Sequence, residues 1–382
     1  MNDTLATLLN EKRIVIVAGA GGVGKTTTAA SLGLLAAQQL GKRVLVLTVD
    51  PARRLADAMG LADFGNVITR VDLTGTTRTR SDGALFAAML DTKSSWDDLV
   101  ARYAPNLRVR EEILSNPIYK NISTRFVQSH DYIAMEALFD LHNKGDYDLI
   151  VVDTPPSRNA IDFLDAPKRM AEFFSSRLLR WIIAPYRNRL VASAFKPFYQ
   201  VADRIIGSQF LAEVAEFFML FQSMYEGFVQ RADAVSALLK SPKASFIVVA
   251  TAEYLPVREA EFFLGALKDR NLNCGALLIN RALPSYLGDR NVYESAVSLT
   301  TDQGRLAKVG DGETERKLLQ SVLTQIGRTF IEFSEMYQQE RTLLSTLSLD
   351  STKILQAPYI EGDVADIKAL ELLSSRVDSI IF

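Results

Sequence analysis

Short runs of apolar residues without polar alternation recur along the chain and predict the strands of a buried sheet. They cover residues 13–18, 43–49, 84–90, 147–153, 245–250, 274–279 and 353–356. Unbroken apolar character is typical of parallel strands, which are covered on both faces. Segments with the three-to-four-residue spacing of amphipathic helices separate most of these runs. The alternation predicts an α/β fold, a parallel sheet with helices on both faces and right-handed crossovers.

Two stretches of helical spacing interrupt this alternation. Residues 94–144 carry it with a break at Asn116 and Pro117, because proline stops a helix. Residues 163–228 hold 14 of the chain's 34 aromatic residues, more than twice the average density. We expect an inserted helical subdomain at 94–144 and 165–235, and a core at 1–93, 145–164 and 236–382. The aromatic face could form the subdomain's own core or a groove for a hydrophobic partner.

Four further segments complete the pattern. Residues 61–83 have the composition of a loop, and residues 284–312 are polar and contain glycine. Residues 314–347 form one long helical pattern, and a last helix is expected near 364–379.

The first predicted strand runs directly into a glycine-rich loop. Gly19, four further residues, Gly24, Lys25 and Thr26 fit the phosphate-binding-loop pattern in full, and helix-forming sequence follows. The glycines let successive backbone N–H groups turn around phosphate oxygens, and the helix start adds partial positive charge. Lys25 adds a full charge, and the Thr26 hydroxyl can ligate Mg²⁺. Since the loop and both flanking elements agree, we predict a nucleotide-phosphate site.

Two aspartates stand where predicted parallel strands end. Asp50 follows the strand at 43–49, and Asp153 closes the strand at 147–153. Ligands of open α/β sheets bind at the carboxyl ends of the strands, so we expect both acids beside the glycine loop. An apolar run that ends in aspartate is typical of the Walker B pattern, which is weak alone and strong beside a phosphate loop. The alternative is that each acid only caps its strand.

Composition narrows the class of protein. The chain has 382 residues, of which 48% are hydrophobic and 23% charged, as in a globular protein. A net charge of −2 argues against a strongly basic nucleic-acid or membrane surface. Cys274 is the single cysteine, so one chain can form no disulfide and no two-cysteine metal site. The N-terminus lacks a secretory pattern and no run of about 18 apolar residues occurs, which predicts a cytoplasmic protein.

Six motifs follow one another along nearly the whole chain. They are AGAGGVGKTTTAASLG (18–33), TVDPARRLADAMG (48–60), YDLIVVDTPPSRNAIDFL (147–164), ATAEYLPVREAEFFLGAL (250–267), LLINR (277–281) and APYIEGDVADIKAL (357–370). In their content and order the chain resembles the ArsA and guided-entry (GET pathway) targeting ATPases, in their bacterial, cysteine-poor branch. This family belongs to the deviant Walker A P-loop ATPases, with MinD and ParA. The resemblance implies a P-loop ATPase core, a nucleotide-switched dimer and a helical subdomain for a hydrophobic client.

The resemblance also assigns roles, position by position. The residues expected to cradle ATP are Gly19, Ala20, Gly21, Gly22, Val23, Gly24, Lys25, Thr26 and Thr27. Lys25 would contact the β and γ phosphates, and Asp50 would orient or deprotonate the attacking water, as phosphoryl transfer requires. Asn280 would pair with adenine, and Pro358 would pack on the base. The residues expected around Mg²⁺ are Thr26, Asp50 and Asp153.

The chain departs from the family in three respects. The family's signature lysine, which stabilises transition-state charge in the partner's site, is replaced by Ala20, which puts fast hydrolysis or the usual dimer geometry in doubt. Arg53, Arg54 or Arg158 could supply this charge, or each could be a structural or surface arginine. The cysteine pair of the zinc-clamped targeting dimer and the cysteines of an arsenite site are both absent. We therefore expect neither zinc nor arsenite to bind.

Two hypotheses of function follow. The first is an ArsA-like ATPase that binds and hydrolyses MgATP and couples its switches to a helical subdomain for a hydrophobic protein client or partner. The second is a nucleotide-dependent binding or assembly protein that hydrolyses ATP weakly, as one half of a heterodimer with a paralogue. A homodimer or heterodimer is expected, without nucleic acid. Peripheral membrane contact stays open, because basic residues flank the aromatic helices.

Overall fold

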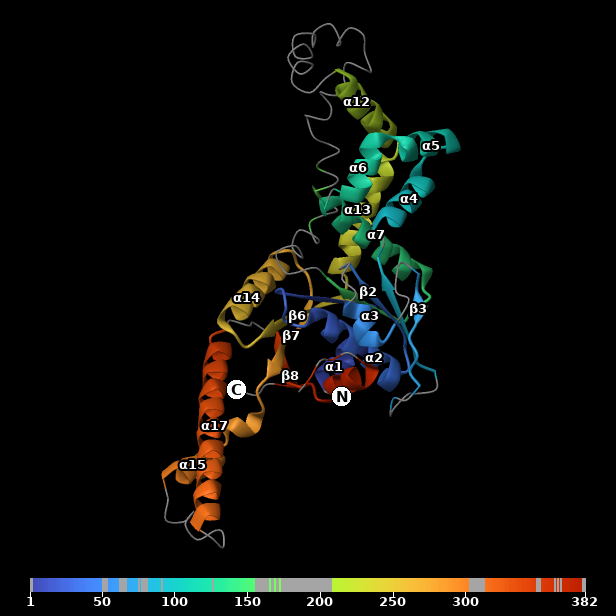
Figure 1. Cartoon of the computed structure of the whole chain (residues 1–382). Helices are drawn as coiled ribbons and strands as arrows, with labels where there is room; N and C mark the ends of the chain where they lie inside the picture. The colour runs from blue at the N-terminus through green and yellow to red at the C-terminus, as the bar shows by residue number, and fades with distance from the viewer. Residues whose placement is uncertain are drawn as a thin grey trace.

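Seven apolar strands pair in parallel and form the middle of a nine-stranded sheet (Figure 1). Their order across the sheet is β4-β2-β5-β1-β6-β7-β8. Their bounds are β1 Ile14–Gly19, β2 Arg43–Thr48, β4 Ala84–Met89, β5 Leu149–Asp153, β6 Ala244–Thr251, β7 Cys274–Ala282 and β8 Lys353–Pro358. These are the seven strands that the unbroken apolar runs predict.

The computed structural model describes residues 3–49, 54–61, 67–74, 76, 82–90, 92–125, 127–154, 165, 168, 169, 172, 208–301, 313–347, 352–360, 362, 364 and 366–379. Asp50, Arg53 and Arg158 therefore lie outside the described residues.

Two-residue strands pair antiparallel at both edges of the sheet. β3 (Thr69–Arg70) pairs with β4, and β9 (Asp378–Ser379) pairs with β8. The sequence pattern predicts neither, because two residues are too few to show a period. The last helix is shorter than the expected range of 364–379. Helix α18 covers Ile367–Ser375, and β9 follows it.

Alternate side chains of the strands enter two different hydrophobic clusters. In β1, Val15 and Val17 belong to one cluster, and Ile14 and Ile16 belong to the other. On the first face lie α1 (Asp3–Glu11), α2 (Lys25–Leu40), α3 (Arg54–Met59) and α18. On the second face lie α7 (Val127–Lys144), α13 (Tyr225–Lys240) and α14 (Tyr254–Asp269). The predicted α/β fold with helices on both faces is confirmed.

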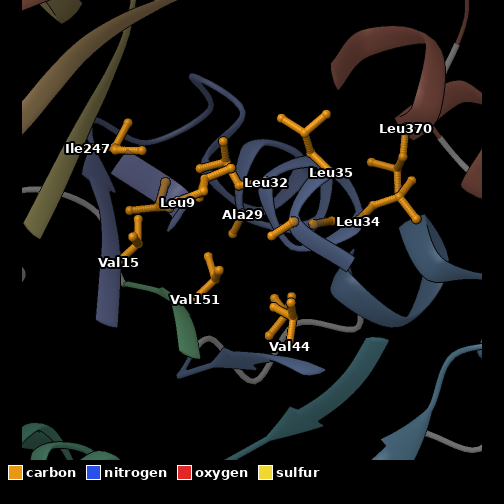
Figure 2. Close-up of a cluster of buried hydrophobic side chains, with 14 of the residues drawn as sticks. Leu9, Val15, Ala29, Leu32, Leu34, Leu35, Val44, Val151, Ile247 and Leu370 are labelled. Carbon is orange, nitrogen blue, oxygen red and sulfur yellow. The ribbon is translucent and has the colours of Figure 1, made fainter. Parts of the chain in front are cut away.

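Helix α2 is the most deeply enclosed part of the first layer. Figure 2 shows Leu32 and Leu34 of this helix among Val15, Val44 and Val151 from three neighbouring strands. All five side chains are at most 2% exposed. The glycine loop is therefore attached at both ends to rigid elements, β1 before it and α2 after it.

A third hydrophobic cluster lies among helices beyond the sheet. It is formed by α4 (Thr92–Tyr103), α5 (Leu107–Ser115), α6 (Pro117–Arg125), α12 (Ser208–Gln222) and the first part of α13 (Figure 1). The predicted break is confirmed, because α5 ends before Asn116 and α6 begins at Pro117. The Asn116 Oδ1 atom accepts a hydrogen bond from the Ile118 N–H group at 2.8 Å and so caps α6.

Three aromatic side chains of α12 that the structure describes face this cluster. Phe217, Phe218, Phe221 and Met224 are at most 7% exposed, and the Trp96 ring lies 6.1 Å from that of Phe221. These residues form a core rather than an open groove. Residues 173–207, which carry much of the aromatic stretch, and the side chains of Phe210, Tyr225 and Phe228 lie outside the described residues.

The polar stretch 284–312 contains helices that its composition does not predict. A short 3₁₀ helix η1 (Ser285–Gly288) precedes α15 (Arg290–Thr301), which packs along α17 (Glu313–Ser345), the long helix expected at 314–347. The helices meet at Gly327, where an added Cβ would lie 2.7 Å from the Ala296 carbonyl oxygen. Val292, Ala296 and Leu299 follow helical spacing in α15, but only Ala296 of these is buried and Val292 is 40% exposed. Among the described residues, we find no helix with the length and apolar character to cross a membrane.

Phe217→Ala should lower the free energy of unfolding by about 3–5 kcal/mol, because it leaves a cavity among buried rings. Phe262→Ala is the matched control, since Phe217 is 1% exposed and Phe262 is 69% exposed. The control should cost less than about 1 kcal/mol. Urea unfolding followed by circular dichroism measures both values. Equal losses would contradict the assignment of Phe217 to a core.

Candidate nucleotide site

The glycine loop makes a tight turn between β1 and α2. A Cβ on Gly19 would lie 2.1 Å from the Val249 carbonyl oxygen of β6, so a larger residue does not fit. Gly24, the N-cap of α2, has a left-handed backbone with φ 92°. No side-chain hydrogen bond caps this helix. Its first N–H groups and the positive end of its dipole therefore favour an anion in the loop.

Three neighbouring strands end around the Asp153 carboxylate. Its Oδ2 atom accepts hydrogen bonds from Thr26 Oγ1 at 2.8 Å and from Thr48 Oγ1 at 3.0 Å. The parallel register sets this meeting, because Asp153 of β5 pairs with Val17 of β1 and with Thr48 of β2. Thr26 and Asp153 are thus in contact, as expected of two residues around one metal ion. Thr48 was not predicted, because it ends an apolar strand and no motif marks its role.

The chemistry of this contact fits Mg²⁺. Magnesium takes oxygen ligands, keeps several waters, and binds through one or two carboxylates together with substrate phosphates. Thr26 and Asp153 supply a hydroxyl and a carboxylate oxygen within hydrogen-bond distance, next to the glycine loop. Asp50, the third residue expected around the metal, lies outside the described residues.

Lys25 folds back onto the loop. Its Nζ atom donates a hydrogen bond to the Ala20 carbonyl oxygen at 2.8 Å, and the residue is 8% exposed. The ammonium group thus lies within the loop, and its three N–H donors allow it to bind a phosphate with or without this carbonyl. Ala20 presents only a methyl group and is 8% exposed, so the loop offers no cationic side chain at this position.

A hollow of about 590 Å³ extends from the glycine loop toward the ends of β7 and β8. Thr27 lines it together with Asn280 and Pro358, the two residues expected to contact adenine. The structure therefore brings together residues that stand far apart in the sequence. Arg281 and Tyr359 also line the hollow and were not predicted. Each directly follows a predicted residue, which is the only signal that the sequence offers.

Of the three arginines considered as replacements for the signature lysine, Arg54 is described. It is exposed at the start of α3 and lines the same hollow as Thr27. Arg54 therefore remains a candidate for the positive charge that Ala20 does not supply at the nucleotide site.

Comparison with known families agrees with this geometry. The family model of the anion-transporting ATPases (ArsA ATPase) matches residues 12–309. The chain belongs to this family. It is accordingly an ATPase with a P-loop core, and the matched residues include the glycine loop, Asp153 and Asn280, whereas Pro358 lies beyond them.

Curated relatives of this ArsA-family chain span most of its length. The ATPase get3 of Aspergillus niger is 27% identical over 291 residues, which cover 74% of this chain and 77% of the relative. The ATPase GET3 of Malassezia globosa is 25% identical over 287 residues, with coverage of 73% and 76%. The ATPase ASNA1 homolog 2 of Paramecium tetraurelia is 26% identical over 292 residues, with coverage of 74% and 80%.

Gly19→Ala should destabilise this ArsA-family protein by at least about 2 kcal/mol, because the new methyl group meets the Val249 carbonyl and β1 must shift. Gly21→Ala is the control, since a Cβ there has no atom within 4 Å. It should change the free energy of unfolding by less than about 0.5 kcal/mol. Thermal and urea unfolding without nucleotide test the pair. A neutral Gly19→Ala would show that the loop does not press against β6.

Proposed function

We propose that this ArsA-family chain binds MgATP at residues 19–27 and hydrolyses it, with Asp50 orienting or deprotonating the attacking water. The observation that carries the proposal is the hydrogen bond from Thr26 Oγ1 to Asp153 Oδ2. It joins the first turn of a phosphate-binding helix to a buried carboxylate, which is the donor set of a Mg²⁺–phosphate site. An ordinary glycine turn between a strand and a helix has no need of this contact.

The proposed reaction depends on charge and position rather than on a covalent intermediate. Lys25 and the first N–H groups of α2 would bind the phosphate oxygens. Mg²⁺ held by Thr26 and Asp153 would supply further neutralisation of phosphate charge. Asn280 and Pro358 would hold the adenine ring in the adjoining hollow.

We further propose that residues 94–144 and 165–235 form a helical subdomain whose position follows the nucleotide state. The chain path supports this coupling, because α7 passes through Gly145 into β5, and β5 ends at Asp153. A shift of Asp153 toward or away from a bound metal would thus move the end of α7. The subdomain helices α4 and α13 both pack on α7 and would follow it.

An ion-pair network joins these three helices. Arg231 of α13 donates to the Glu136 carboxylate of α7 at 3.0 Å and also pairs with Asp140. Arg102 of α4 pairs with the same Asp140 carboxylate. The Arg231 guanidinium also lies over the Phe139 ring, 4.5 Å from its centre. Hydrogen bonding to Asp140 raises the pKa of Arg102, so this guanidinium stays charged at physiological pH.

The proposal includes a dimer, a hydrophobic protein client and a cytoplasmic location, without nucleic acid. The dimer would pair two copies or one copy and a paralogue, and contact with a membrane surface would be peripheral. Because Phe217 and Phe221 are buried, the client would bind other residues of the helices. The similarity over most of both chains to ATPases named get3 supports a common architecture.

A second function is favoured by one observation, the methyl group of Ala20. A chain without the signature lysine would bind ATP and hydrolyse it weakly, unless Arg53, Arg54 or Arg158 supplies the charge. Such a protein would act as a nucleotide-dependent binding or assembly factor, with a paralogue that provides the lysine. Turnover measured on the pure chain separates the two functions.

Lys25→Ala should weaken ATP binding by about 10- to 100-fold, because charged hydrogen bonds contribute about 1.5–3 kcal/mol each. Isothermal titration calorimetry with MgATP measures the change. Lys317→Ala, at an exposed position of α17, is the control and should bind as the parent protein does. If Lys25→Ala bound MgATP as tightly as the parent protein, the proposed nucleotide site would be wrong.

Asp50→Asn should keep ATP affinity within about threefold and lower turnover by about 100-fold or more, because it cannot accept a proton from water. Asp233→Asn, at an exposed position of α13, is the matched control. Steady-state phosphate release measures turnover for both. Equal turnover of Asp50→Asn and the parent protein would contradict the role of Asp50. Tight ATP binding by the parent protein without turnover would favour the second function.

A further inference from the structure

Asn280 reaches from the end of β7 to the glycine loop. Its Nδ2 atom donates a hydrogen bond to the Val23 carbonyl oxygen at 2.9 Å, and the residue is 7% exposed. Its Oδ1 atom accepts from the Arg281 N–H group at 3.0 Å. An amide side chain has two N–H donors and two acceptor lone pairs. One donor and one lone pair are therefore used within the protein, and one of each is left for a ligand.

The contact extends to Gly24, the N-cap of α2. A Cβ on Gly24 would lie 2.3 Å from Asn280 Nδ2, so the amide occupies the space that any other side chain at position 24 would need. Gly24 also has φ 92°, a backbone that glycine adopts readily. The glycine at this position is thus required both by the turn and by Asn280.

The backbone beside Asn280 is shaped to make this reach. Arg281 has a left-handed φ of 58°, which is rare for a residue with a side chain and costs of order 1 kcal/mol. The β7–β8 register is interrupted between Ile279 and Ala282. The strand therefore bends where Asn280 contacts the loop, and the Oδ1 bond to the Arg281 N–H group holds the bend.

We propose that Asn280 is a positioning residue for the phosphate loop, in addition to the adenine contact that belongs to the proposed function. Without nucleotide, two loop carbonyls are held by side chains: Ala20 by Lys25 and Val23 by Asn280. An ammonium group has three N–H donors, so Lys25 can bind phosphate with or without its bond to Ala20. Asn280 can keep its bond to Val23 and bind a base with its second N–H. The loop therefore stays shaped whichever partner Lys25 takes, and Asn280 links the phosphate-binding loop to the base.

A ligand that has phosphates but no base separates the two roles. Inorganic tripolyphosphate with Mg²⁺ can bind the loop but can make no adenine contact. Asn280→Leu keeps a similar volume and removes both hydrogen bonds. Pro358→Ala is the matched control, because Pro358 lines the base hollow and no hydrogen bond between it and the loop occurs in the described residues. Thermal unfolding checks that both variants fold.

Calorimetry should show tripolyphosphate binding weakened by about 3- to 10-fold in Asn280→Leu, the loss of one buried hydrogen bond, and unchanged in Pro358→Ala. Both variants should bind ATP more weakly than the parent. Tripolyphosphate binding that is equal in Asn280→Leu and the parent would overturn the proposal and leave Asn280 as a base contact alone.

Amide hydrogen exchange of residues 19–27 without nucleotide gives a second readout that needs no ligand. Exchange should be faster in Asn280→Leu than in the parent and unchanged in Pro358→Ala. Equal protection in all three proteins would also overturn the proposal. If the parent binds no ATP, the proposed function fails, and the exchange experiment still decides the role of Asn280.

Discussion

The Asp153 carboxylate is the point on which the site depends. Its Oδ2 atom accepts hydrogen bonds from the hydroxyl groups of Thr26 and Thr48. The carboxylate therefore joins the first turn of α2 to the ends of β2 and β5. At 1% exposure the carboxylate has little water to replace these bonds. Parallel pairing brings the three strand ends level, and the loop at the end of β1 is thereby held against the same acid.

The rest of the sheet makes this point rigid. Side chains of β1 enter separate clusters on both faces, and α2 packs against β1, β2 and β5 with α1, α3 and α18 beside it. The glycine loop is then fixed from two further directions, by the backbone of β6 at Gly19 and by Asn280 at Gly24. Such enclosure favours a preorganised phosphate site, because little reorganisation is needed when charge must be bound.

The sequence predicted the parts of this structure that have a strong local signal. Seven unbroken apolar runs became seven parallel strands, and the loop pattern together with the strand ends predicted that Thr26 lies beside Asp153. Features with a short or weak local signal were missed. Thr48 acts through one hydroxyl at the end of an apolar strand, α15 buries one alanine, and the two edge strands have two residues each. The aromatic density of α12 indicated an apolar helix face. It did not indicate what packs against that face, because the partners come from α4, α5 and α6.

The most direct test of the account is the effect of Mg²⁺ on ATP affinity, measured by calorimetry with Mg²⁺ and with EDTA, in the parent and in Asp153→Asn. The variant keeps the size of the side chain and one acceptor oxygen for the Thr26 and Thr48 hydroxyls, but removes the negative charge. We expect the parent protein to bind ATP more tightly with Mg²⁺ than with EDTA, and Asp153→Asn to lose most of this difference. A variant with the full Mg²⁺ effect would contradict the claim that Asp153 organises a metal–phosphate site.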